Sequence, residues 1–189
     1  MKRIVIFASG SGSNAEQIIN HFKNSELVSV TKVFTNNKNA GVIDRCKRLN
    51  IPFAIFNKSD FSTSDIVLND VKINADYVIL AGFLWRIPQA FVEYFSKKII
   101  NIHPALLPKY GGKGMYGMNV HNAVKENKET ETGITIHFVN ENYDEGAIIF
   151  QAKTQLETSD TPEDIANKIH LLEYEYFPKV IEETILKHG

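Results

Sequence analysis

Short apolar runs that alternate with amphipathic helical segments are the feature that most constrains how this 189-residue chain folds. The first run, residues 4–8, has no polar interruption, which is typical of a parallel strand covered on both faces. A helical pattern follows it, with apolar residues along one face at Ala15, Ile18, Ile19 and Phe22. Because the same succession recurs, the sequence predicts right-handed β–α–β units and a largely parallel sheet.

The other elements are predicted from the same patterns. Further strands are expected at residues 27–34, 51–56, 77–80 and 99–103, and helices at residues 42–49, 61–73, 91–95 and 121–124. Residues 133–139 and much of 147–153 alternate between apolar and polar side chains, so we expect an antiparallel pair at one end of the sheet. A last helix is expected to begin at Thr161 and Pro162, and Pro178 should kink or restart it.

The predicted architecture is a single α/β domain over residues 1–189. It is Rossmann-like, with a mostly parallel twisted sheet, helices on both faces and an antiparallel addition near the C-terminal part. A hydrophobic fraction of 43% and a charged fraction of 23% are ordinary for a soluble globular protein. The net charge of −1 favours neither a nucleic-acid surface nor a membrane surface.

Cys46 is the only cysteine, and it lies on the apolar side of its predicted helix with Val42 and Leu49. An internal disulfide is therefore excluded, and a buried, inert thiol is the expected state. No segment approaches the roughly 20 apolar residues of a membrane-spanning helix, and the first apolar run is too short for a signal peptide. We therefore expect a cytoplasmic protein.

A loop at residues 10–15, called the glycine loop below, joins the first strand to the first helix and matches the pattern G-x-G-x-x-[GA]. Dinucleotide sites with this pattern also use an acid at the end of the second strand, where residues 35–37 read Thr-Asn-Asn. We favour a single phosphate monoester, held by free backbone N–H groups together with Ser13 and Asn14. A tight turn with serine or asparagine capping is the remaining interpretation.

The strand at residues 99–103 ends in an amide and an imidazole, Asn101 and His103. Alternate residues of a strand share a face, so the two side chains should point the same way. Pro104 has no N–H for a strand ladder, so the strand should stop directly after His103. Such a pair is suited to holding an oxyanion and moving a proton, and ligands in open α/β sheets bind beyond the strand C-termini.

His137 and Asp144 have ordinary structural explanations. A histidine on an alternating strand is more often packed than catalytic, and an acid in a turn usually bonds its own backbone. Together with His103 and His121 they could be considered metal ligands, but none has the spacing of an H-x-x-x-H pair, so we expect no metal. No G-x-S-x-G motif for a nucleophilic serine is found in the sequence.

Four motifs together resemble one known family. They are Phe-Ala-Ser-Gly-Ser-Gly-Ser-Asn at residues 7–14, Ala-Gly-Phe-Leu at 81–84, Asn-Ile-His-Pro-Ala-Leu-Leu-Pro at 101–108, and Thr-Gly-Ile-Thr-Ile-His-Phe-Val at 132–139 followed by Asp144 and Gly146. Over nearly its whole length the chain is similar to the phosphoribosylglycinamide formyltransferases of the folate-dependent formyltransferase superfamily. The Asn-x-His-Pro and Asp-x-Gly motifs belong to the superfamily, and the Gly-Ser-Gly-Ser-Asn loop narrows the choice.

The resemblance implies transfer of a formyl group from the co-substrate 10-formyltetrahydrofolate to the amine of 5-phosphoribosylglycinamide, a step of purine biosynthesis. The amine would attack directly, through a tetrahedral intermediate and with no metal. Asn101 would donate to the oxyanion of that intermediate. His103 would stabilise the same charge and move a proton, and Asp144 would face His103, raise its pKa and help relay the proton.

The resemblance also implies which residues bind the substrates. Gly12, Ser13 and Asn14 would hold the ribose phosphate. Glu173 would lie near the glycinamide substrate, and a solvated helix acid is an equally good interpretation of that residue. The residues implied on the folate side are Leu84, Trp85, Arg86, Ile87, Asn101, His137 and Val139.

The chain departs from the family pattern in three places. Trp85 and Arg86 stand where many members have an arginine directly after the hydrophobic residue, so their side-chain roles are open. Ser64 stands where several members carry an arginine near the folate, so that contact is not carried over. Residues 109–118 form a longer and more glycine-rich loop, which we expect to be a mobile lid, with Lys113 approaching the phosphate.

Other members of the superfamily provide the alternatives. Methionyl-tRNA formyltransferase would be expected to have a further C-terminal domain and a basic surface, formyltetrahydrofolate hydrolase an additional N-terminal domain, and sugar-nucleotide formyltransferases more chain. An NAD-linked reductase or a non-catalytic nucleotide-binding module is disfavoured, because the acid that would bind the ribose is missing at the end of the second strand. The expected partners are the two small-molecule substrates, with no nucleic acid and no membrane, for a monomer or a homodimer.

Overall fold

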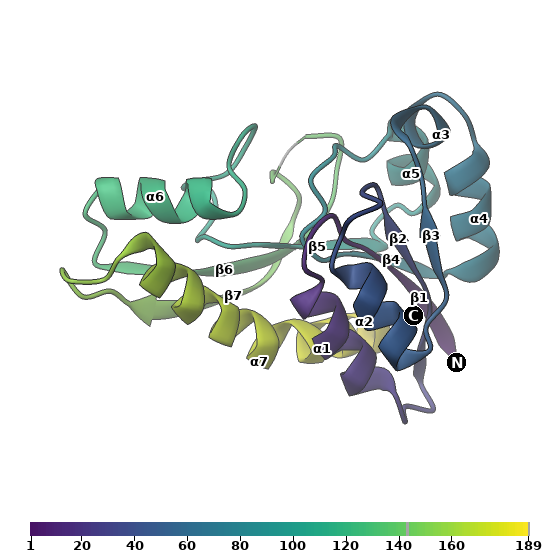
Figure 1. The fold of residues 1–189 in the computed structure, drawn as a ribbon, viewed down its shortest axis with the longest axis horizontal. Helices are drawn as coiled ribbons and strands as arrows, with labels where there is room; N and C mark the ends of the chain where they lie inside the picture. The colour runs from purple at the N-terminus through teal and green to yellow at the C-terminus, as the bar shows by residue number, and fades with distance from the viewer. Residues whose placement is uncertain (143, 189) are drawn as a thin grey trace.

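The computed structural model describes residues 1–142 and 144–188. Its centre is a seven-stranded sheet in the order β3-β2-β1-β4-β5-β6-β7 (Figure 1). The strands are β1 (Lys2–Phe7), β2 (Val28–Thr35), β3 (Phe53–Ile55), β4 (Tyr77–Leu80), β5 (Ile99–His103), β6 (Glu131–Phe138) and β7 (Ile148–Gln155). The first five strands pair in parallel, whereas β6 is antiparallel to β5 and β7 is antiparallel to β6. The predicted parallel sheet with an antiparallel addition is therefore confirmed.

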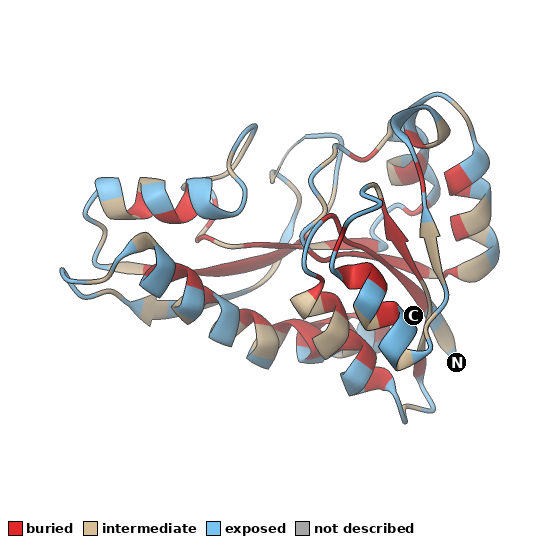
Figure 2. Ribbon diagram, viewed as in Figure 1, coloured by how far each residue is buried: buried red, intermediate tan, exposed pale blue. Residues whose placement is uncertain are grey.

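The described residues form seven helices, of which six lie between strands and the last follows β7. They are α1 (Ser13–Phe22), α2 (Val42–Leu49), α3 (Lys58–Ser62), α4 (Ile66–Asn74), α5 (Gln89–Tyr94), α6 (Met118–Glu126) and α7 (Pro162–His188). Neighbouring residues of β1 belong to opposite cores, Ile4 to the one with α1, α2, α6 and α7, and Val5 to the one with α3, α4 and α5. Burial is concentrated on the sheet and on the inward sides of the helices (Figure 2). Helices on both faces explain why the inner strands are uninterrupted apolar runs.

The single helix predicted at residues 61–73 was wrong, because the chain forms two helices there, α3 and α4. The amide oxygen of Asn57 accepts from the N–H of Asp60 and starts α3 earlier than predicted. The hydroxyls of Thr63 and Ser64 donate to backbone carbonyls four residues before them, at 2.9 and 3.1 Å. Thr63 leaves helical geometry at φ −121°, so this polar cluster interrupts the apolar stripe that suggested one helix.

Helix α7 runs through Pro178 without ending, so of the kink or restart predicted at this proline, the restart was wrong. The helix buries apolar side chains on both sides of the proline, including Ile169, Phe177, Ile181 and Ile185. Proline inside a helix removes a hydrogen bond and costs about 3 kcal/mol. Burial of several large side chains at about 1.5–3 kcal/mol each offsets that cost, so packing decides the outcome.

The order of the strands predicts a binding site beyond the C-terminal ends of the central strands. The chain leaves β1 toward β2 on one side, and β4 and β5 continue on the other side, so β1 and β4 flank the switch point of the topology. Ligands of open α/β sheets bind beyond the strand C-termini at such a point. The loop after β1 and the end of β5 at His103 both lie there. No described helix is long and apolar enough to cross a membrane.

Candidate active site

A cavity of about 460 Å³ lies beyond the C-terminal ends of β1, β4 and β5. It is lined by residues 10–14, 81–84, 101–104 and 112–117, together with His121, Asp144, His170 and Glu173. The structure therefore brings the glycine loop, the Asn-x-His pair, Asp144 and Glu173, which are far apart in sequence, to one hollow. Among the histidines of this lining, His121 and His170 are the ones that the sequence did not suggest for substrate binding.

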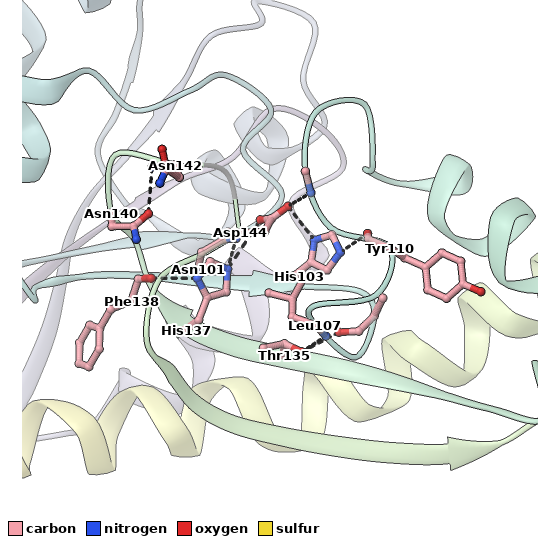
Figure 3. A network of polar contacts seen from close by, with 12 residues as sticks. Asn101, His103, Leu107, Tyr110, Thr135, His137, Phe138, Asn140, Asn142 and Asp144 are labelled. Carbon is pink, nitrogen blue, oxygen red and sulfur yellow. Dashed lines mark hydrogen bonds and ion pairs between the residues drawn. The ribbon is translucent and has the colours of Figure 1, made fainter.

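His103 is almost fully buried, with 3% of its surface exposed. Its Nε2 lies 2.7 Å from the backbone carbonyl of Tyr110, which accepts only, so Nε2 carries a hydrogen. Its Nδ1 faces the carboxylate of Asp144, with Oδ2 at 3.6 Å (Figure 3). Each ring nitrogen of His103 therefore faces an oxygen acceptor.

Asp144 lies between two histidines and also holds the glycine-rich loop. Its Oδ2 accepts from the N–H of Gly112 at 2.9 Å, and its Oδ1 lies 3.7 Å from Nε2 of His137. Its backbone has φ +56°, in the left-handed region that aspartate tolerates better than most residues. The carboxylate is thus fixed beside His103 by contacts from three segments of the chain.

Asn101 faces His137 across the antiparallel pairing of β5 and β6. Nδ1 of His137 lies 2.9 Å from the carbonyl of Phe138, so this nitrogen is the donor. Burial lowers the pKa of His137, which keeps the ring neutral near pH 7. Its Nε2 therefore accepts from the amide Nδ2 of Asn101 at 3.0 Å, and the second amide hydrogen of Asn101 is left for a ligand.

The glycine loop ends at the start of α1, where Gly12 has φ +74°. A Cβ on Gly12 would lie 2.5 Å from the side chain of Val42, so only glycine fits this turn. The first backbone N–H groups of α1 have no carbonyl partner inside the helix, and no side chain caps them. Ser13 and Asn14 thus stand at a helix N-terminus that favours an anion.

Glu173 is buried, with 5% of its surface exposed, although its helix position allowed a solvated acid. Its Oε2 accepts from Nδ2 of Asn14 and from Nδ1 of His170, both at 2.9 Å. The hydrogen bond to Glu173 raises the pKa of His170, against the opposing effect of burial. The spacing of His170 and Glu173, three residues apart on one helix, is the sequence signal that could have identified His170.

The residues expected on the folate side surround a neighbouring hollow of about 80 Å³. Its lining includes Leu84, Trp85, Arg86, Ile87, Asn101, His137, Val139 and Asp144. Nη2 of Arg86 donates to the carbonyl of Glu141 at 2.5 Å, which ties the two walls of the hollow together. Trp85 also packs edge-on against Phe56 with ring centroids 6.0 Å apart, so part of its role is structural. A larger, open hollow beside it is lined by Lys58, Arg86 and Gln89.

Residues 112–117 of the glycine-rich loop line the main cavity. Lys113 lies in this lining together with Gly12, Ser13 and Asn14, as the predicted approach to a phosphate requires. Three loop glycines, Gly112, Gly114 and Gly117, have positive φ. In residues 1–142 and 144–188, no three His, Cys, Asp or Glu side chains are arranged to hold a metal ion.

Comparison with known proteins identifies the family to which this chain belongs. Residues 2–181 match the formyl transferase family. A phosphoribosylglycinamide formyltransferase of Arabidopsis thaliana, described as chloroplastic, is 40% identical over 97% of this chain and 67% of its own length. One from Haemophilus influenzae is 34% identical over 96% of this chain and 86% of its own length.

Solved structures agree with these relatives. The crystal structure of glycinamide ribonucleotide transformylase 1 from Geobacillus kaustophilus has a TM-score of 0.89 and 31% identity, over 98% of this chain and 99% of that one. The chain therefore belongs to the formyl transferase family, and the resemblance seen in the sequence motifs is confirmed.

Proposed function

We propose that this chain transfers a formyl group from 10-formyltetrahydrofolate to the amine of 5-phosphoribosylglycinamide, in the synthesis of purines. The observation that carries the proposal is the convergence of Asn101, His103 and Asp144 on one cavity whose other end is the N-terminus of α1. The cavity thus has charge-stabilising groups at one end and an anion site at the other. The names of the related proteins support the same activity.

The chemistry is the exchange of one C–N bond for another. The glycinamide nitrogen attacks the formyl carbon, the bond to N10 of the folate breaks, and one proton passes from the attacking nitrogen to N10. Negative charge collects on the formyl oxygen in between. The free amide hydrogen of Asn101 is positioned to donate to this oxygen, because the other is held by His137. No covalent intermediate with the protein is required.

His103 and Asp144 supply the proton relay in this proposal. The carboxylate of Asp144 lies 3.6 Å from Nδ1, so it is placed to accept the hydrogen of that nitrogen while His103 faces the oxyanion. Nε2 is held by the carbonyl of Tyr110 in this structure, so contact of that nitrogen with substrate requires Tyr110 to move away. Tyr110 belongs to the glycine-rich loop, so the predicted lid motion and the freeing of His103 would be one event.

The two substrates would enter from different sides. The phosphate would lie against the backbone of Gly12, Ser13 and Asn14, with Glu173 beside the sugar and glycinamide portion. The pterin would enter the hollow lined by residues 84–87 and Val139, next to His137. This places the formyl carbon between the hollows, at Asn101, which lines both.

The choice of acceptor separates this proposal from its relatives in the superfamily. The purified chain would be given 10-formyltetrahydrofolate with 5-phosphoribosylglycinamide, with methionyl-tRNA, or with water alone, and release of tetrahydrofolate would be followed. We expect release to depend on 5-phosphoribosylglycinamide. Release with water alone, or formylation of the tRNA only, would contradict the proposal.

We place this activity in the cytoplasm. The single thiol, Cys46, is fully buried, and burial raises its pKa to about 11, so the thiol is unreactive, as its place on the apolar side of its helix predicts. Labelling of intact and fractionated cells with an antibody to the chain would test the location.

A further inference from the structure

His121 lies on α6, has no role in the proposed reaction so far, and lines the main cavity. Only 4% of its surface is exposed. Its Nδ1 is buried and has no hydrogen-bond partner in the described residues. A buried polar atom without a partner costs free energy, so a histidine kept only for packing would be expected to have one.

A second buried polar atom without a partner lies in the lining of the same cavity. The amide of Asn14 donates through Nδ2 to Glu173, and its Oδ1 is left buried and unpartnered. Asn14 and His121 come from the first and the sixth helix, and both line the cavity that Glu173 also lines. Two unsatisfied atoms on separate helices around one hollow indicate a ligand with polar groups of its own.

The charges around His121 identify the kind of ligand group. Burial lowers its pKa, Glu173 opposes this, and His170 and His103 add to it. A neutral imidazole offers one donor and one acceptor. Oδ1 of Asn14 and the carboxylate of Glu173 are acceptors only, which would repel a phosphate. A hydroxyl group, which both donates and accepts, satisfies this set.

We propose that His121 is a substrate-binding residue that hydrogen-bonds a ribosyl hydroxyl of 5-phosphoribosylglycinamide, with Oδ1 of Asn14 beside it. The assignment rests on the proposed function and adds a residue to its substrate site. A half-turn of the imidazole about its Cβ–Cγ bond exchanges the sides of Nδ1 and Cδ2, so the ring can present this nitrogen to the sugar. The phosphate remains with the N–H groups at the start of α1.

Steady-state kinetics of three variants test the proposal. His121→Phe keeps a ring without nitrogen, His121→Asn keeps an amide near the place of Nδ1, and Asn122→Ala alters the next, exposed residue of α6 as a control. For His121→Phe we expect KM for 5-phosphoribosylglycinamide to rise about tenfold, the worth of one hydrogen bond, with KM for 10-formyltetrahydrofolate unchanged. His121→Asn should stay nearer to the wild type, and Asn122→Ala should equal it.

A His121→Phe protein that is folded by circular dichroism and has an unchanged KM would overturn the assignment. If that variant fails to fold, nitrogen NMR of the wild-type protein decides, with the His121 signals assigned through His121→Asn. Addition of 5-phosphoribosylglycinamide should shift a ring nitrogen of His121, and an unmoved signal at saturation would overturn the assignment. A wild-type protein that binds this substrate without formyl transfer would instead contradict the proposed function.

Discussion

At the level of single residues, the site depends on how hydrogen atoms are distributed over two histidines. His137 has its hydrogen on Nδ1, held by the carbonyl of Phe138, so its Nε2 must accept. This fixes which way the amide of Asn101 points and therefore where its free hydrogen lies. His103 differs, because both of its nitrogens face oxygen acceptors. The ring of His137 thus orients the proposed oxyanion donor, and the ring of His103 is the proposed proton carrier.

Replacement of Asn101 tests the first of these roles. Asn101→Ala removes the proposed oxyanion donor, and we expect kcat/KM for formyl transfer to fall about a hundredfold or more. The melting temperature should change little, because Asn101 is half-buried at the mouth of the cavity. A variant that melts much earlier but turns over normally would show that the amide only supports the strand.

The buried state of His137 predicts a dependence of stability on pH. Its pKa is lower in the folded chain, so below about pH 6.5 the unfolded chain binds the proton first. The unfolded state then holds more protons, and the free energy of unfolding falls as the pH decreases. His137→Gln keeps an acceptor for Asn101 but does not titrate.

We therefore expect the free energy of unfolding of His137→Gln, measured with urea, to fall less than that of the wild type between about pH 7.5 and about pH 5.5. His121, whose pKa is also lowered, and His170, whose pKa is raised, are present in both proteins. The difference between the two proteins thus isolates His137. Equal pH dependence would mean that the pKa of His137 is the same in the folded and the unfolded chain.

At the level of secondary-structure elements, the reversal of direction after β5 brings together the proposed catalytic residues. Because β6 runs antiparallel to β5, His137 lies directly opposite Asn101. The connection after β6 then returns Asp144 to the end of β5, next to His103. The loop between β5 and α6 joins the same group through Tyr110 and Gly112. Two connections that leave neighbouring strands therefore meet at His103.

The loop can be tested with two lysines that it carries. Lys113 lines the cavity, whereas Lys109 pairs with Glu129 at 2.9 Å. Lys113→Ala should raise KM for 5-phosphoribosylglycinamide about three- to tenfold, because a lysine bond to phosphate is charge-assisted. Lys109→Ala should leave this KM unchanged, because exposed ion pairs contribute little. Equal effects of the two variants, or none, would contradict a lid that reaches the phosphate.

At the level of the whole molecule, the sequence predicted the features that depend on local pattern. The apolar runs located the parallel strands, because a strand buried on both faces has apolar side chains throughout. Alternation located the antiparallel pair, because a strand buried on one face has apolar side chains at every second position. The Asn-x-His pair was recognised as a candidate site because Pro104 ends a strand at a known edge of the sheet. The split between α3 and α4 was missed, since hydroxyl bonds of Thr63 and Ser64 compete with an apolar stripe.

Contacts between distant residues were the part that no local pattern could supply. The burial of Glu173 depends on Asn14, 159 residues away, and on the packing of α7 against α1. His121 had no motif around it, and only the cavity shows that it shares a lining with Asn14 and Glu173. The hydrogen bond from His103 to the carbonyl of Tyr110 likewise depends on the path of the glycine-rich loop. That path cannot be predicted from the sequence, because glycine allows many backbone conformations.

Formyl transfer by the wild type and by His103→Ala, measured side by side, tests the central claim most directly. The wild type should convert 10-formyltetrahydrofolate and 5-phosphoribosylglycinamide to tetrahydrofolate and the formylated product. His103→Ala, folded by circular dichroism, should lose at least about a hundredfold in kcat, because it lacks the group proposed to move the proton. A folded wild type without transfer, or a His103→Ala variant as fast as the wild type, would contradict the account.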